Sequence, residues 1–127
     1  MRILIIDDSK SVQKSVSWKL TKKGHEIVGA GSDGYEGLQL YAKTRPDLVL
    51  LDITMPNKDG RQCLKEILEM NSNAKIVMLS ALSTQEIIDD CLKSGAIAFI
   101  DKNQIMTQEY LESQISEIIT KFSLKCA

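Results

Sequence analysis

The stretch that decides the fold of this chain is Val49–Pro56, with the sequence VLLDITMP. A short apolar run between turn signals is typical of a strand that is buried on both faces of a parallel sheet. An aspartate in the middle of such a strand would lose its hydration at a large cost in free energy. Asp52 is therefore expected at the carboxyl end of the strand, which is the edge where open parallel sheets bind ligands.

The start of the chain repeats this arrangement, because the apolar run of residues 2–6 ends in Asp7 and Asp8. If the first and third strands are neighbours, as in a doubly wound sheet, these two acids and Asp52 meet at one switch point. Two carboxylates about 4 Å apart repel each other by roughly 4 kcal/mol at an effective dielectric near 20. Such a site is expected either to keep protons at neutral pH or to bind a hard cation.

An all-oxygen set of ligands on an open, watery edge favours Mg²⁺ or Mn²⁺ over Zn²⁺. The simpler alternative is that each acid only ends its strand in a turn. That alternative explains one such aspartate more easily than it explains all three together.

The rest of the chain continues as strand followed by helix. Apolar runs predict further strands, and apolar residues at helical spacing follow each of them. Short connections join the segments, which indicates an α/β domain with helices on both faces of one parallel sheet. We expect a single domain that covers residues 1–127, with strands at 2–6, 26–30, 49–52, 74–79 and 96–100.

Composition narrows the classes of function. The 127 residues carry a net charge of -1, with acidic and basic side chains interspersed, so we expect neither a nucleic-acid partner nor a membrane partner. The cysteines Cys63, Cys91 and Cys126 are odd in number and widely spaced, which is typical of small apolar side chains in a reducing compartment. Without a signal peptide or an apolar stretch of roughly 20 residues, the chain is expected to be cytoplasmic.

Two further polar residues end strands and complete a chemical set. Ser80 follows the fourth predicted strand and Lys102 follows the fifth. Three carboxylates, a hydroxyl and an ammonium suit a tetrahedral anion beside a metal ion. A carboxylate that attacks phosphorus needs its own charge and the phosphoryl charges neutralised. Asp52 is the best nucleophile because it lies centrally, between the acid pair and the hydroxyl.

In this order the motifs resemble the receiver domain of two-component response regulators, over essentially the whole chain. Because the sequence ends with the fifth helix, single-domain receivers of the chemotaxis type are the expected group. The matching pieces are Asp7-Asp8, the run Leu51–Pro56 with Asp59-Gly60, the run Leu79–Ala81, and Gly95-Ala96 with Phe99 and Lys102.

The resemblance implies the sheet order 2-1-3-4-5 and a phosphorylation-activated signalling switch. Asp52 would accept a phosphoryl group from a phosphohistidine on a sensor histidine kinase or a histidine phosphotransfer protein. Asp8 and Asp52 would bind Mg²⁺ (or Mn²⁺) together with the main-chain carbonyl of Thr54, and Asp7 would act through water. Lys102 would pair with the phosphoryl oxygens.

The resemblance also implies how the signal leaves the site. Ser80 would rotate to bond the phosphoryl group, and Phe99 would move inward with it. The charge of the phosphoryl group would thereby shift an equilibrium between two conformations of the domain. This shift would change the face formed by the fourth helix, fifth strand and fifth helix, to which a downstream protein binds. Such a domain is not an enzyme, since it catalyses only its own phosphoryl transfer and dephosphorylation. The plainer alternatives are a core role for Phe99 and ordinary surface roles for Ser80 and Lys102.

One residue departs from the family pattern. The family usually has proline after the lysine, joined by a cis peptide bond, and this chain has Asn103. A cis bond before a residue other than proline costs about 2.5 to 4 kcal/mol. We therefore predict either a trans bond with a shifted loop or a strained cis bond, which puts the reach of Lys102 in doubt.

Three other functions stay open at this point. A phosphatase of the haloacid-dehalogenase type needs a second acid two residues after its nucleophile, where this chain has Thr54. A flavodoxin-type module needs a loop rich in hydroxyls and glycine after the first strand, where residues 7–10 read DDSK. A receiver that signals by binding alone would keep the fold without being phosphorylated.

Overall fold

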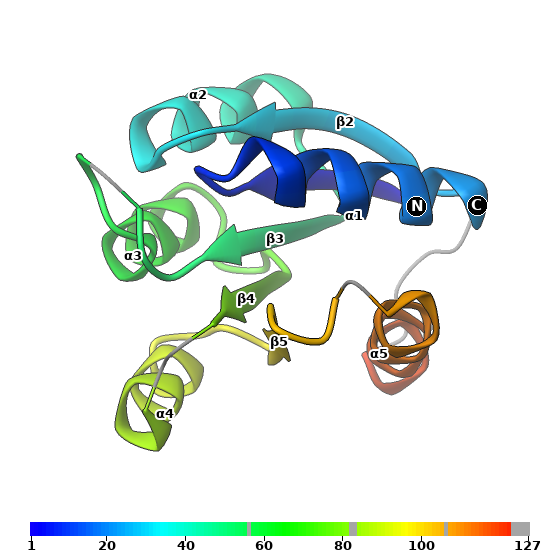
Figure 1. Cartoon of the computed structure of the whole chain (residues 1–127). Helices are drawn as coiled ribbons and strands as arrows, with labels where there is room; N and C mark the ends of the chain where they lie inside the picture. The colour runs from blue at the N-terminus through cyan, green and yellow to red at the C-terminus, as the bar shows by residue number, and fades with distance from the viewer. Residues whose placement is uncertain (56, 82–83, 106, 123–127) are drawn as a thin grey trace.

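A parallel five-stranded sheet with the order β2-β1-β3-β4-β5 forms the centre of the computed structural model, which describes residues 1–55, 57–81, 84–105 and 107–122 (Figure 1). Every neighbouring pair of strands is parallel. The predicted α/β class and strand order are confirmed. The elements are β1 (Arg2–Ile6), α1 (Lys10–Lys22), β2 (Glu26–Gly31), α2 (Gly34–Thr44), β3 (Leu48–Asp52), α3 (Gly60–Met70), β4 (Ile76–Ser80), α4 (Gln85–Lys93), β5 (Ala98–Asp101) and α5 (Gln108–Lys121).

Helices cover both faces of the sheet, and alternate residues of each strand point to opposite faces. On β1, Leu4 and Ile6 pack in the cluster formed with α2, α3 and α4, while Ile3 and Ile5 pack in the cluster formed with α1 and α5. All residues of β3 and β4 are buried. This burial on both faces explains why the strands read as continuous apolar runs, with polar residues confined to their ends.

Four of the described helices begin at a side-chain cap. The side chains of Ser9 and Asp59 accept hydrogen bonds from backbone amides in the first turns of α1 and α3. Asp33 and Thr84 do the same for α2 and α4. Because Ser9 starts α1 directly after Asp7 and Asp8, those acids lie in the turn between strand and helix.

Strand ends differ from the predicted ones by one or two residues. β4 begins at Ile76, not at residue 74, and extends to Ser80; β5 begins at Ala98, not at residue 96, and extends to Asp101. Ser80 and Asp101 are register partners, so backbone pairing continues past the apolar run into polar residues. The hydrophobic pattern of the sequence does not predict this pairing of Ser80 with Asp101.

The structure bears on the predictions made for the cysteines and for a membrane-spanning segment. Cys63 and Cys91 are buried free thiols, in line with an apolar packing role. Cys126 and Pro56 lie outside the described residues. Within the described ranges, no helix combines the length and the apolar character needed to cross a bilayer.

Gly60 allows the loop after β3 to fold back against the strand that carries Asp52. A Cβ atom at this position would lie 2.0 Å from the carbonyl oxygen of Asp52. We expect Gly60→Ala to lower the free energy of unfolding in a urea titration by about 2–3 kcal/mol, because backbone must move to admit the methyl group. Gly29→Ala is the control, since its Cβ would meet only the flexible side chains of Leu4 and Leu40, at 3.3 Å or more. Equal losses in the two variants would contradict this prediction.

Candidate functional site

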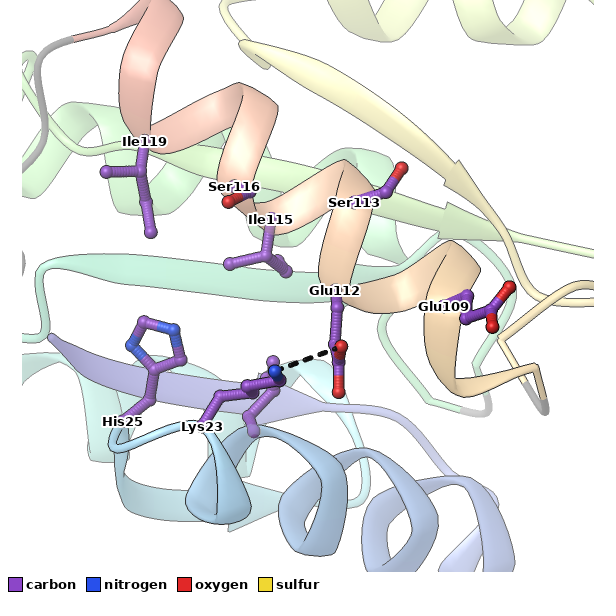
Figure 2. Close-up of a pocket in the computed structure, with 9 residues that line it drawn as sticks. Lys23, His25, Glu109, Glu112, Ser113, Ile115, Ser116 and Ile119 are labelled. Carbon is purple, nitrogen blue, oxygen red and sulfur yellow. Dashed lines mark ion pairs between the residues drawn. The ribbon is translucent and has the colours of Figure 1, made fainter.

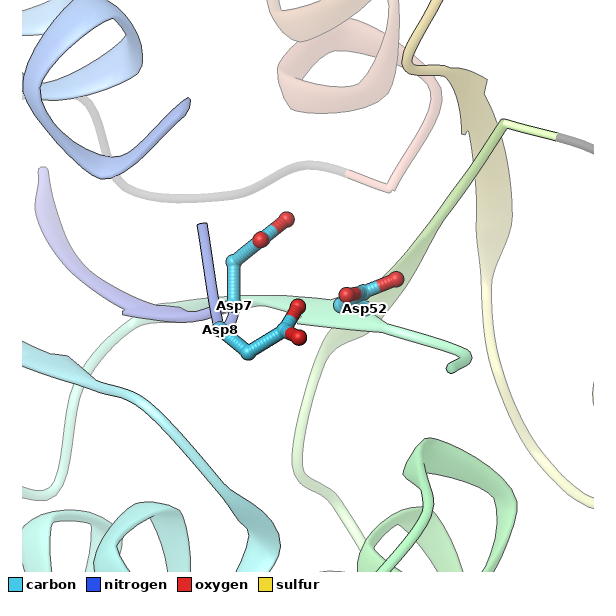
Figure 3. A group of neighbouring side chains, drawn as sticks. All are labelled: Asp7, Asp8 and Asp52. Atoms are coloured by element: carbon cyan, nitrogen blue, oxygen red, sulfur yellow. The ribbon is translucent and has the colours of Figure 1, made fainter. Parts of the chain in front are cut away.

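Three carboxylates gather at the carboxyl ends of the two central strands β1 and β3. Ile6 and Leu51 are register partners, so Asp7 and Asp52 leave the sheet side by side. One oxygen from each of Asp7, Asp8 and Asp52 lies within 4.8 Å of the others (Figure 3). Asp7 is fully buried and Asp52 is 3% exposed, whereas Asp8 is exposed. The structure thus brings together the acids that the sequence placed at one switch point.

The side chain of Lys102 lies between the two buried carboxylates. Its Nζ is 2.9 Å from Oδ2 of Asp7 and 3.4 Å from Oδ2 of Asp52. The other oxygen of Asp7 accepts a hydrogen bond of 2.8 Å from the backbone amide of Ser9. Oδ2 of Asp7 is buried and lacks a well-formed hydrogen bond among the described residues, so the ammonium balances its charge. Lys102 therefore does reach the acids, although Asn103 follows it.

The proton affinity of Asp52 reflects this crowding. Burial, and next the charge of Asp7, raise the pKa of Asp52 to about 7, against the opposing effects of Lys102 and of a hydrogen bond from the Thr54 amide. Burial lowers the pKa of Lys102, but the nearby carboxylates of Asp7 and Asp52 outweigh it and raise that pKa above its usual value. The lysine stays charged, and the three acids still carry more negative charge than it neutralises.

The spacing of the acids suits a hard cation. Oxygens bound to one octahedral Mg²⁺ at about 2.0–2.1 Å lie roughly 3 Å apart when adjacent and roughly 4 Å apart when opposite. The observed 4.8 Å limit is only slightly wider, so a small closing movement would make the carboxylates co-ligands. Asp8 is exposed, which leaves room for the water molecules that Mg²⁺ usually retains. The donor set and its geometry both fit the predicted metal.

An open pocket of about 410 Å³ surrounds the acids. Ser80, which is 4% exposed, lines this pocket with Lys102 and Thr54. Phe99 is half-buried and lies apart from the acids, in an apolar contact region between β5 and α4. The pocket is lined by Asp8, Asp52, Ile53, Thr54, Asp59, Arg61, Ser80, Ala81, Ile87 and Lys102.

Several residues of the site were not anticipated from the sequence. The buried amide of Gln13 donates to the carbonyl of Asp7 at 2.6 Å and to that of Gly31 at 3.0 Å, and so fixes the end of β1. Arg61, in the first turn of α3, lines the pocket and lies 4.0 Å from Asp59. No local pattern marks Gln13, because its side chain joins the ends of β1 and β2, which are separate segments of the sequence.

The peptide bond after Lys102 is trans, which agrees with the first of the two predicted alternatives as far as the bond is concerned. The described residues contain no cis peptide bond, so Lys102 and Asn103 are joined in trans. The side-chain amide of Asn103 donates to the carbonyl of Ala81 at 2.7 Å. This contact joins the loops that leave β4 and β5.

A second hollow lies between the end of α1 and α5, and Figure 2 shows its lining side chains. Nζ of Lys23 and Oε2 of Glu112 form an ion pair of 3.3 Å across it. Nδ1 of His25 lies 3.1 Å from the amino group of Met1. This hollow shares no lining residue with the acid pocket, so the candidate chemistry is confined to the latter.

Comparison with known proteins bears on the family of this chain. Residues 3–116 match the family described as "Response regulator receiver domain". Chemotaxis protein CheY of Thermotoga maritima is 34% identical over 122 residues, which cover 96% of this chain and 97% of that protein. Chemotaxis protein CheY of Treponema pallidum is 42% identical over 103 residues, which cover 80% of this chain and 72% of that protein.

Solved structures show the same fold. The CheX-CheY-BeF3-Mg²⁺ complex from Borrelia burgdorferi contains a chain with a TM-score of 0.86 and 34% identity, and the match covers 96% of this chain and 89% of that one. Chemotaxis protein CheY4 of Vibrio cholerae has a TM-score of 0.84 and 26% identity, with 92% of this chain and 97% of that one covered.

These relatives bear on the functions left open by the sequence. CheY-like receivers are signalling proteins and not classical enzymes, which argues against the phosphatase alternative. Receiver domains bind Mg²⁺ at an acidic site and interact with histidine kinases and downstream targets. The chain therefore belongs to the response regulator receiver domain family and is a homologue of CheY, consistent with a phosphorylation-activated signalling switch.

Proposed function

We propose that Asp52 is the phosphoacceptor of this receiver. An oxygen of Asp52 would attack the phosphorus of a phosphohistidine on a sensor histidine kinase or a histidine phosphotransfer protein. The new O–P bond forms as the N–P bond breaks, and its electron pair returns to the imidazole nitrogen. The observation that carries this proposal is the position of Asp52, in the acid cluster and 3.4 Å from the Lys102 ammonium, on an open pocket.

Asp8 and Asp52, with the main-chain carbonyl of Thr54, would hold Mg²⁺ (or Mn²⁺), and Asp7 would act through a bound water. The cation supplies positive charge that offsets the repulsion between the carboxylates and the incoming phosphoryl oxygens. Asp7 is suited to the indirect role, because one of its oxygens already accepts from Ser9 and the other is paired with Lys102.

Lys102 and Ser80 would receive the phosphoryl group. The ammonium of Lys102 lies close enough to Asp52 to transfer its contact to a phosphoryl oxygen without a large movement of the backbone. Ser80 lines the same pocket, and its hydroxyl would donate to a second oxygen after a rotation about its side-chain bond. The Lys102 ammonium, the Ser80 hydroxyl and the bound cation would then compensate the charge of the phosphoryl group.

Phe99 would carry the change to the surface. It lies one residue before Ile100 on β5 and lines the apolar contact region with Ile88 and Leu92 of α4. A shift of Ser80 and the chain that follows it would alter this packing, and with it the face formed by α4, β5 and α5. A downstream protein that binds this face would distinguish the two states.

Incubation with acetyl phosphate or phosphoramidate tests this function directly. Intact-protein mass spectrometry is expected to show a gain of one phosphoryl group with Mg²⁺, and none with EDTA. Asp52→Asn should abolish the gain, whereas Asp89→Asn, an exposed acid of α4 that is absent from the pocket lining, should keep it. A gain that persists in Asp52→Asn would refute the assignment. Steady release of phosphate without an adduct would instead favour an enzyme.

A further inference from the structure

The contact between Asn103 and Ala81 joins the two segments that carry the accessory groups of the site. We propose that Asn103 is a positioning residue that latches the end of β4, at Ser80 and Ala81, to the loop that begins at Lys102. The hydroxyl of Ser80 and the ammonium of Lys102 are thereby held in one arrangement relative to Asp52. This inference rests on the proposed function, since it assigns those two groups to the phosphoryl group on Asp52.

The geometry extends the pairing of β4 and β5 by one step. The backbone amide of Lys102 donates to the carbonyl of Ser80 at 2.8 Å, and the side-chain amide of Asn103 donates to the next carbonyl, that of Ala81, at 2.7 Å. The successive carbonyls of Ser80 and Ala81 thus accept hydrogen bonds from the successive residues Lys102 and Asn103. The second bond acts where the chain leaves the sheet, beyond Ser80 and Asp101, the last register pair of β4 and β5 among the described residues.

Asn103 is itself anchored, which a latch requires. Its backbone amide donates to Oδ1 of Asp101 at 2.9 Å, and the side chain of Gln104 donates to Oδ2 of the same residue at 3.1 Å. Further along the loop, the carbonyl of Ile105 accepts a hydrogen bond of 2.6 Å from the buried Lys19 of α1. The loop after Lys102 therefore has fixed partners on β5 and on α1.

Proline at this position would provide neither of the two hydrogen bonds that Asn103 donates. It lacks a backbone N–H for Asp101 and has no side-chain amide for Ala81. Because the acceptor on Ala81 is a carbonyl, the asparagine must present its NH₂ group there. Aspartate has nearly the same shape and keeps the backbone N–H, but it would place a carboxylate against that carbonyl.

Phosphorylation rates with acetyl phosphate and Mg²⁺ test the latch. We expect Asn103→Ala to slow the gain of a phosphoryl group by about 3–10-fold and Asn103→Asp to slow it at least as much, with Mg²⁺ affinity unchanged. Asn73→Ala is the matched control, because it removes an exposed asparagine side chain from the loop before β4, outside the lining of the acid pocket, and its rate should stay within about twofold of the wild type. Wild-type rates in both Asn103 variants would overturn the proposal.

A double-mutant cycle separates positioning from a general loss of structure. If Asn103 acts through Ser80, then Asn103→Ala should add less than about a twofold change in a Ser80→Ala background. The full effect in that background would contradict the part of the proposal that concerns Ser80. Thermal unfolding of each variant checks that the fold is retained.

Hydrogen exchange provides a readout that does not depend on phosphorylation. The amide of Lys102 donates to Ser80, so its exchange should be faster in Asn103→Ala than in the wild type. Unchanged exchange would overturn the latch even if the protein is phosphorylated. Absence of phosphorylation in the wild type, together with faster exchange in the variant, would overturn the proposed function and leave the latch in place.

Discussion

Lys102→Met is expected to slow phosphoryl transfer to Asp52 by about 100-fold, the usual cost of removing one charged or hydrogen-bonding group from a developing anion. Methionine keeps an unbranched stem of similar length but brings no charge. Removing the ammonium has two effects, because this group both lies next to the site of phosphoryl transfer and offsets the charge of the buried carboxylates of Asp7 and Asp52. Without it the pKa of Asp52 would rise further, and less of the nucleophilic carboxylate would be present at neutral pH.

The rate constant for phosphorylation by acetyl phosphate, measured at saturating Mg²⁺ by intact mass, checks this prediction. Lys23→Met is the control, since Lys23 forms its ion pair with Glu112 in the separate hollow between α1 and α5. Raising the pH should increase the rate of Lys102→Met by a larger factor than the rate of the wild type, because Asp52 loses its proton at a higher pH in the variant. A Lys102→Met rate close to that of the Lys23→Met control would show that Lys102 has no part in the transfer.

Asp52→Asn is expected to stabilise the metal-free protein above neutral pH by about 2–4 kcal/mol, on the basis of roughly 1.36 kcal/mol for each unit of pKa shift. The pKa of Asp52 rises from an ordinary 3.8 to about 7 in the folded state. The folded protein therefore binds this proton more tightly than the unfolded chain does. That contribution to stability is fully present below pH 3.8 and is lost as the pH rises through about 7.

Urea titrations of the metal-free proteins at several pH values between about 3.5 and 8 measure this difference. At about pH 3.5 Asp52 is protonated in the folded protein and largely protonated in the unfolded chain, so it resembles asparagine and the two proteins should have similar free energies of unfolding. At about pH 8 the variant should be the more stable one, and added Mg²⁺ should stabilise the wild type more than the variant, since the wild type keeps a full set of carboxylate ligands. Stability curves that run parallel over this range would contradict the raised pKa of Asp52.

Local patterns were sufficient to predict the α/β class and the members of the acid cluster, whereas the strand order came from the resemblance to receiver domains. The apolar runs that end in Asp7-Asp8 and in Asp52 identify buried parallel strands, and such strands place their carboxyl ends at one edge. Ser80 and Lys102 follow from the same rule applied to β4 and β5. Strand boundaries were less certain, because the pairing of Ser80 with Asp101 depends on the partner strand and not on hydrophobicity.

The sequence by itself therefore determined the alternation of strands and helices and the identity of the acids, because each of these depends on neighbours along the chain. Only the tertiary structure decided the pKa of Asp52, the reach of Lys102 to Asp7, and the bond from Asn103 to Ala81. Burial and the distance between charges set the first two, and the approach of two separate loops sets the third. These quantities arise from packing in three dimensions, which no local spacing of residues encodes.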